Sequence, residues 1–177
     1  MLSLHPRIAE VVAELESAQA QMHAAIAAVP ASAHTARPNA ESWTIAEVIE
    51  HLMMLEDSTG RLIGGMLKQL EGTTDSETDP IGPTMARFQV EKPLRKLAAP
   101  DMVKPTGVPM ADALARQSAS RERLISSLKA GSGRALNTKT YPHPFLGELN
   151  GYQWALLVAQ HQRRHLVQID AIAAAVA

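Results

Sequence analysis

Hydrophobic residues recur at spacings of three and four along four stretches of this chain, and this period predicts four amphipathic helices. The first stretch covers residues 3 to 29 and stops before Pro30. The second runs from about 45 to 71 and ends near Gly72. Thr44 and Glu47 have the spacing of a capping box, so we expect the second helix to begin directly after Thr44.

The third and fourth helices follow in the C-terminal half of the chain. One starts around Pro109, a residue that a first helical turn tolerates, and ends at Gly131. Turn-forming residues then fill the segment 137–148, NTKTYPHPFLGE. Asn150 and Gln153 have the spacing of a second capping box, and an apolar line continues from there to about residue 172. This line predicts the last helix.

Between the second and third helices, prolines interrupt every candidate period. Residues 72 to 108 therefore predict irregular structure with one short helix near 91 to 98. This long segment is either a wall or lid over a pocket, or a packed connector between two helices that point the same way. Four amphipathic helices, few strand signals and one crossover predict an all-α fold, a four-helix bundle with a long crossover loop between its second and third helices.

Composition narrows the class of protein. The chain has 177 residues, of which 46% are hydrophobic, and this predicts one globular domain over residues 1–177. The formal charge is −1 with no basic cluster, so we expect neither a nucleic acid nor a membrane as partner. The N-terminus lacks the basic start and apolar core of a secretory signal, and we expect a cytoplasmic protein.

Candidate chemistry gathers in the last helix. The chain contains no cysteine, which excludes disulfides, thiolate ligands and a cysteine nucleophile, so a metal site must use nitrogen and oxygen. The segment HQRRH places His161 and His165 four residues apart, with Cβ atoms about 5 to 6 Å apart on one helical face. Two imidazoles at this separation can share one metal ion. They follow Trp154 and Val158 on the apolar line and so face the interior, although core histidines satisfied by side chains and waters are the alternative.

A third imidazole comes from the second helix. His51 lies three residues after Val48 and four before Leu55, so it also faces inward. A lone histidine there is more often a satisfied core residue, but facing helices of a bundle can present ligands at one level. Together with the pair in the last helix, His51 predicts a metal site of three histidines. Three neutral imidazoles leave a coordination position open, as catalytic sites do.

Two long segments of the chain carry a resemblance to a known family. NAESWTIAEVIEHL and HPFLGELNGYQWALLVAQHQRRHLVQI resemble the DinB-like superfamily, whose members are regarded as metalloenzymes. In that family a histidine follows the tryptophan-containing start of the second helix and an HxxxH motif lies in the last helix. The intervening KLAAPDMVKPTG is similar to the family's loop before the third helix.

The resemblance implies a divalent metal, zinc or nickel, held by His51, His161 and His165. It also implies a thiol-dependent S-transferase, or a related transferase or hydrolase, that acts on a small molecule with a low-molecular-weight thiol as co-substrate. Relatives that form homodimers lead us to expect a homodimer. Two other functions stay open: a metal-binding stress or sensor protein without turnover, and a helical dimerisation module whose histidines belong to the core.

Supporting roles can be assigned to two polar residues. Glu47 lies four residues before His51 on the same helical face and is a candidate proton acceptor, although the capping box explains it equally well. Gln168, three residues after His165, is a candidate for orienting a ligand or contacting substrate, with a core hydrogen bond as the simpler account. His143 competes for a ligand role, but it stands between two prolines about 16 Å of helix away from His161, and we interpret it as part of a turn.

Overall fold

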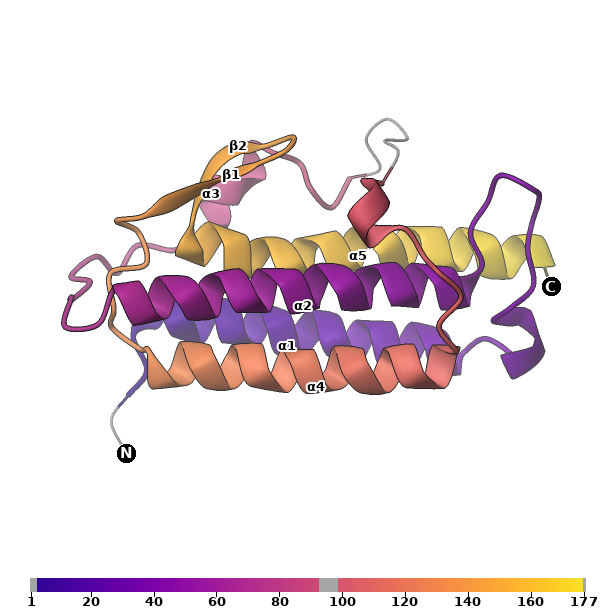
Figure 1. Ribbon diagram of the computed structural model, residues 1–177, viewed down its shortest axis with the longest axis horizontal. Coiled ribbons are helices and arrows are strands. Elements are labelled where there is room, and N and C mark those ends of the chain that lie inside the picture. Colours follow the sequence, from indigo (N-terminus) through magenta and orange to yellow (C-terminus); the bar gives the residue numbers. More distant parts are fainter. Residues whose placement is uncertain (1–2, 93–98, 177) are drawn as a thin grey trace.

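A computed structural model of the protein describes residues 3–92 and 99–176. Four long helices lie side by side in it (Figure 1). They are α1 (Pro6–Ala27), α2 (Ile45–Gln69), α4 (Met110–Ala130) and α5 (Gly151–Val176). Helix α2 packs against α4 and α5, and α1 packs against the same two helices from the other side. The predicted four-helix bundle is therefore confirmed, and the helix bounds differ from the predicted ones by only a few residues.

The crossover between α2 and α4 travels the length of the bundle, because these two neighbouring helices run in the same direction (Figure 1). The described part of the crossover contains a short helix α3 (Gly82–Ala86) and a 3₁₀ turn η2 (Asp101–Val103); another such turn, η1 (Ala31–Ala33), follows α1. The sequence pattern did not indicate α3, whose Pro83 is tolerated because it lies in the first turn. The short helix expected near 91 to 98 falls mainly on residues 93–98, which lie outside the described residues.

The segment expected to form only turns contains a β-hairpin. Strands β1 (Thr140–His143) and β2 (Gly147–Asn150) pair in antiparallel register, with Tyr141 opposite Leu149. A proline is tolerated here because each strand of a two-stranded sheet is an edge strand, and Gly147 adopts a positive φ of 76° after the turn. The Trp154 indole of α5 donates a hydrogen bond of 3.2 Å to the Tyr141 carbonyl, so the hairpin lies against the start of α5.

The interior consists of two hydrophobic clusters with polar residues between them. The larger cluster surrounds Leu15, Ile63 and Tyr152. The smaller one contains Met22, Ile49 and other residues from the opposite half of each long helix. At the level between them the buried residues are polar: Glu56, Gln117, Arg121 and Gln162. No helix within the described residues is long and apolar enough to cross a membrane.

Candidate metal site

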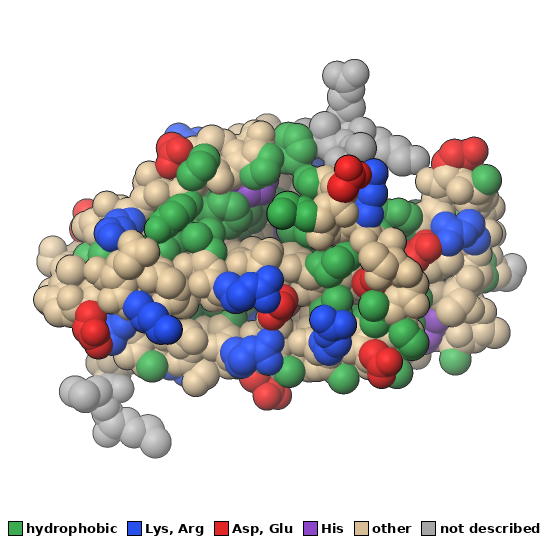
Figure 2. Space-filling model, in the orientation of Figure 1, with side chains coloured by type: hydrophobic (Ala, Val, Ile, Leu, Met, Phe, Trp, Pro, Cys, Tyr) green, Lys and Arg blue, Asp and Glu red, His purple; other side chains and the backbone are tan. Residues whose placement is uncertain are grey.

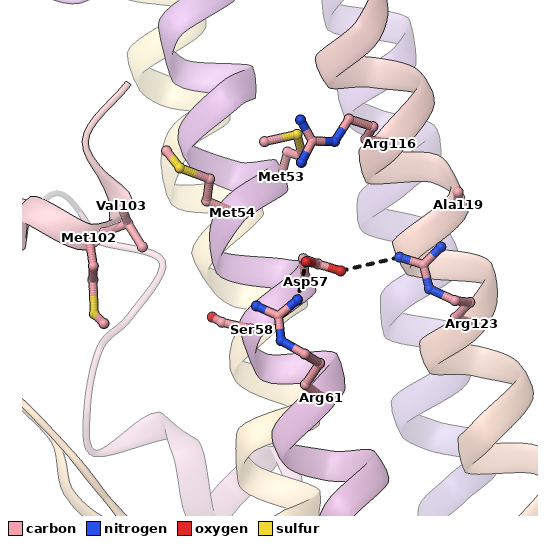
Figure 3. A pocket seen from close by; sticks show the side chains of 10 residues that line it. All are labelled: Met53, Met54, Asp57, Ser58, Arg61, Met102, Val103, Arg116, Ala119 and Arg123. Carbon is pink, nitrogen blue, oxygen red and sulfur yellow. Dashed lines mark hydrogen bonds and ion pairs between the residues drawn. The ribbon is translucent and has the colours of Figure 1, made fainter. Parts of the chain in front are cut away.

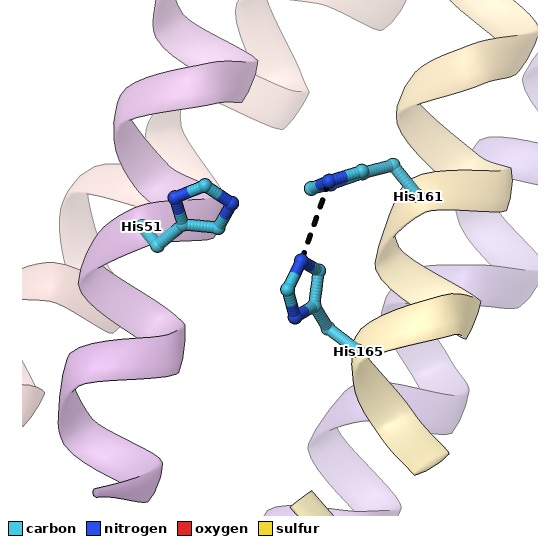
Figure 4. A group of neighbouring side chains, drawn as sticks. All are labelled: His51, His161 and His165. Carbon is cyan, nitrogen blue, oxygen red and sulfur yellow. Dashed lines mark hydrogen bonds between the residues drawn. The ribbon is translucent and has the colours of Figure 1, made fainter. Parts of the chain in front are cut away.

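The three predicted histidines come together between α2 and α5 (Figure 4). One ring nitrogen of each of His51, His161 and His165 lies within 4.8 Å of the others. The Nε2 atoms of His161 and His165 are 3.3 Å apart. Two nitrogen ligands of a tetrahedral ion, each about 2.0–2.1 Å from the metal, are themselves about 3.3 Å apart. The spacing of this pair is therefore that of two ligands of one divalent ion, and His51 completes a group that could hold it.

The helix starts place these rings at one level. The capping box of α2 is formed, with the Glu47 amide donating to the Thr44 hydroxyl and the Thr44 amide donating to the Glu47 carboxylate. This fixes the first residue of α2 and hence the inward direction of His51, which is only 4% exposed. The second predicted capping box is also formed, since Asn150 and Gln153 exchange hydrogen bonds of 3.0 Å at the start of α5.

Hydrogen bonds outside the cluster orient two of the rings. The Nδ1 atom of His51 donates to the Val103 carbonyl at 2.7 Å, and the Nδ1 atom of His165 donates to the Gln168 side-chain oxygen at 2.7 Å. Each neutral ring then has its free lone pair on Nε2, so His161 donates the hydrogen bond that joins it to His165. Gln168 thus contacts His165, while its role toward a ligand or substrate stays a prediction, and the partner of His51 is a backbone carbonyl of the crossover.

Burial keeps all three rings neutral at neutral pH. It lowers the pKa of His51, against the opposing effect of the hydrogen bond to Val103. The pKa of His165 falls to about 4, because of burial and the neighbouring His51. Burial, together with the charges of His165 and His51, also brings the pKa of His161 well below its usual range. Since a metal binds the neutral form of imidazole, the site does not have to lose protons at pH 7 before an ion can bind.

The carboxylate of Glu47 is occupied by other partners. One oxygen accepts from the Thr44 amide at 2.8 Å, and the other pairs with the Arg37 guanidinium at 2.6 Å. Burial raises the pKa of Glu47, but these hydrogen bonds and the charge of Arg37 outweigh it and leave the pKa below its usual value. The contacts explain Glu47 by helix capping, and its catalytic role stays a prediction.

His143 lies on the hairpin, against the first turn of α5. It lies in β1 rather than in a loop, and its ring centroid is 5.2 Å from that of Trp154. Its charge contributes to the lowered pKa of His161, because the hairpin folds back along α5. His143 is nevertheless not a member of the described group of nitrogens that could hold an ion.

Hollows open on the surface on both sides of η2 (Figure 2). A groove of about 480 Å³ between α2, α4 and η2 is lined by methionines and by the Asp57 carboxylate, which pairs with Arg61 and Arg123 (Figure 3). None of the three histidines lines this groove, although it shares Val103 with the site. A second hollow, between the hairpin and η2, has mainly hydrophobic walls with a histidine side chain visible inside (Figure 2).

Two sets of buried polar residues escaped the sequence analysis. Glu50 is 1% exposed and binds the crossover. Glu56 and Arg121 form a buried ion pair next to the site. A signal for Glu56 was present, since it follows Leu52 by four residues on the apolar line of α2. No local pattern indicated the role of Glu50, because its hydrogen-bond partners lie 56 to 58 residues further along the chain.

Comparisons with known proteins agree with this architecture. The chain is 24% identical over 138 residues to YuaE of Bacillus subtilis (strain 168), an uncharacterized protein, with 77% of this chain and 80% of YuaE covered. A solved structure, TT2238, described as a four-helix bundle protein, superposes with a TM-score of 0.61 at 23% identity, covering 93% of this chain and 98% of that one. The profile of the DinB superfamily matches residues 14–169. The chain belongs to the DinB superfamily.

Proposed function

We propose that this protein is a divalent-metal-dependent enzyme that acts on a small molecule. The observation that carries the proposal is the convergence of His51, His161 and His165 with nitrogens within 4.8 Å of one another. Membership in the DinB superfamily supports it. A site for structural zinc is usually closed by four protein ligands, whereas three ligands leave a position for water or substrate.

The chain's own residues supply the ligands and hold them in place. His51, His161 and His165 would bind the ion, while Val103 and Gln168 hold two of the rings in the tautomer with a free Nε2. A bound divalent ion would acidify a coordinated water or thiol and so provide a nucleophile near neutral pH. The hydrophobic walls of the hollow beside the hairpin would admit a small molecule and limit the access of water.

More specifically, we propose that the enzyme is a thiol-dependent transferase and that its metal is zinc or nickel. Its support is the family resemblance of the sequence, together with the all-nitrogen ligand set, which suits both metals. The histidines lie on two different helices, so a co-substrate would approach from the side that neither helix covers.

The proposal is tested by metal analysis and turnover. Protein purified without an affinity tag is expected to contain close to one equivalent of a divalent transition metal, measured by mass spectrometry of the elements. The loaded protein is then assayed with cysteine and other small thiols against a reactive electrophile. Turnover that disappears on chelation and in His161→Ala supports the enzyme, whereas the absence of any stoichiometric metal rejects it.

One observation favours a second candidate, a metal-binding stress or sensor protein without turnover. The groove of about 480 Å³ is lined by none of the three histidines, so this hollow does not open onto the site. This candidate predicts one bound ion per chain and no reaction with any thiol and electrophile pair. The same assay separates the two candidates.

A further inference from the structure

The carboxylate of Glu50 is buried and is satisfied entirely by one short stretch of the crossover. Its Oε1 atom accepts from the Thr106 amide at 2.8 Å and from the Thr106 hydroxyl at 2.7 Å. The Oε2 atom accepts from the amides of Gly107 at 3.0 Å and Val108 at 3.1 Å. Successive amides can converge on one carboxylate because Gly107 has a φ of +97°, a conformation that favours glycine.

The same stretch of the crossover holds the neighbouring histidine. Val103, three residues before Thr106, accepts the Nδ1 hydrogen of His51 through its carbonyl at 2.7 Å. The side chain of Val103 is buried, so this end of the segment 103–108 packs into the protein. Glu50 and His51 are adjacent in α2, and the two side chains therefore bind the two ends of one segment.

We propose that Glu50 is a positioning residue of the metal site: it anchors the segment 103–108, whose Val103 carbonyl fixes His51 in the tautomer with a free Nε2. Glu50 does not touch the ion in this arrangement and acts through the backbone. The inference rests on the proposed metal site, but the effect on the His51 tautomer exists without a metal. Loss of the carboxylate leaves the helix unchanged and releases the segment that holds the imidazole.

The test uses Glu50→Gln in the full chain, because the amide keeps the shape of the side chain. The NH₂ group of glutamine would face at least one backbone N–H donor in either orientation, so at least one hydrogen bond from the crossover backbone is lost. The chain offers a matched control in Glu10, whose carboxylate also anchors the crossover, through the amides of Ile81 and Gly82 at 2.7 Å each, away from the histidines. Glu10→Gln removes an equivalent anchor with no connection to His51.

Two measurements are made on each protein. The dissociation constant for zinc is obtained by competition with a coloured chelator, and nitrogen NMR of the metal-free protein reports the His51 tautomer. We expect Glu50→Gln to weaken zinc binding by about 10- to 100-fold, the range for loss of a partner that orients a ligand. We expect His51 to lose its single Nδ1-protonated signature, and Glu10→Gln to leave both measurements unchanged.

The outcomes separate this inference from the proposed function. If the wild-type protein takes up no zinc or nickel, the proposed function fails, and the NMR measurement still decides whether Glu50 sets the His51 tautomer. If Glu50→Gln folds and keeps both the wild-type affinity and the tautomer, the role of Glu50 is overturned. If Glu50→Gln does not fold, Thr106→Val, which removes only the hydroxyl donor, is expected to weaken zinc binding severalfold, and an unchanged affinity and tautomer in that variant overturns the role.

Discussion

Two sets of buried polar residues lie at neighbouring levels of this bundle and differ in how their hydrogen-bond donors and acceptors find partners. One is the layer of buried polar residues between the two hydrophobic clusters, here called the polar layer: Glu56, Gln117, Arg121 and Gln162. In it, Arg121 pairs with both oxygens of Glu56 and also donates to the Leu15 carbonyl and to Gln162. Gln117 adds a hydrogen bond of 2.6 Å to Glu56, so groups from all four long helices are joined. Charge is balanced within the layer, and its donors and acceptors meet each other.

The histidine cluster is arranged differently. Its three rings are neutral, the outer nitrogens of His51 and His165 bind Val103 and Gln168, and one nitrogen of each ring faces the other two rings. Two of those inner nitrogens share a single hydrogen bond. The comparison shows that burial alone does not mark a site: the polar layer satisfies its own donors and acceptors, whereas His51 and His165 present Nε2 lone pairs that a cation can use.

The largest effect is expected from breaking the polar layer. Arg121→Met leaves the Glu56 carboxylate buried without its counter-ion, and we expect the free energy of unfolding to fall by about 3–5 kcal/mol. Urea unfolding followed by circular dichroism measures it. The double variant Glu56→Leu with Arg121→Met removes both charges and is expected to recover most of the loss. A single variant as stable as the wild type would contradict a structural role for the layer.

Acid is expected to weaken the metal-free protein through the histidine cluster. An unfolded chain protonates histidine near pH 6.5, whereas His165 in the fold resists protonation down to about pH 4. The unfolded state therefore binds more protons in this window, and stability is lost as the pH falls from about 6.5 to about 4, by up to about 3 kcal/mol for this residue. Denaturant unfolding at pH 7 and 4.5 measures the loss. His165→Gln should show a smaller loss, and an equal one would contradict the assignment.

Metal is expected to stabilise the protein only through the cluster. At a free zinc concentration 100 times the dissociation constant, binding adds about 2.7 kcal/mol to the free energy of unfolding. His161→Ala should lose this increase, as measured by unfolding with and without zinc. His143→Ala serves as the control, because His143 is near His161 but outside the group of nitrogens, and it should keep the increase. Equal loss in both variants would make His143 a ligand.

A smaller effect is expected from the partner of His165. Gln168→Leu removes the acceptor of the Nδ1 hydrogen and should weaken zinc binding by about 10- to 100-fold, or about 1.4–2.7 kcal/mol. Isothermal titration in the presence of a competing chelator measures it. Gln168→Glu keeps an acceptor at the same place and is expected to retain the affinity. If Gln168→Leu binds zinc like the wild type, Gln168 does not orient the ring.

The smallest effect is expected at the start of α2. Glu47→Ala removes one side of the capping box, which stabilises the fold by about 1 kcal/mol, and Thr44→Ala should remove a similar amount. Thermal unfolding measures both variants, and neither should change the affinity for zinc. If Glu47→Ala abolishes turnover while Thr44→Ala does not, Glu47 has the catalytic role that its position before His51 suggested.

The sequence predicted what depends on local spacing and missed what depends on the crossover. The period of apolar residues located the helices, and the inward direction of His51, His161 and His165 followed from it. The role of Glu50 could not be predicted, because it is defined by amides that reach it only after the chain has crossed the bundle. The hairpin was missed because its strands have four residues each, and Pro142 weakens the strand pattern.

One contact in the polar layer helps to hold α5 in its axial position. Gln162 directly follows His161, and its side chain accepts from Arg121 of α4 at 2.7 Å. A slip of α5 by a single residue would shift His161 by about 1.5 Å along the helix axis, whereas metal–ligand distances tolerate about 0.2 Å. The contact with Arg121 thus helps to keep the imidazoles of His161 and His165 at their level along the bundle. Any redesign of this bundle for a different ion should preserve the hydrogen bond between Arg121 and Gln162.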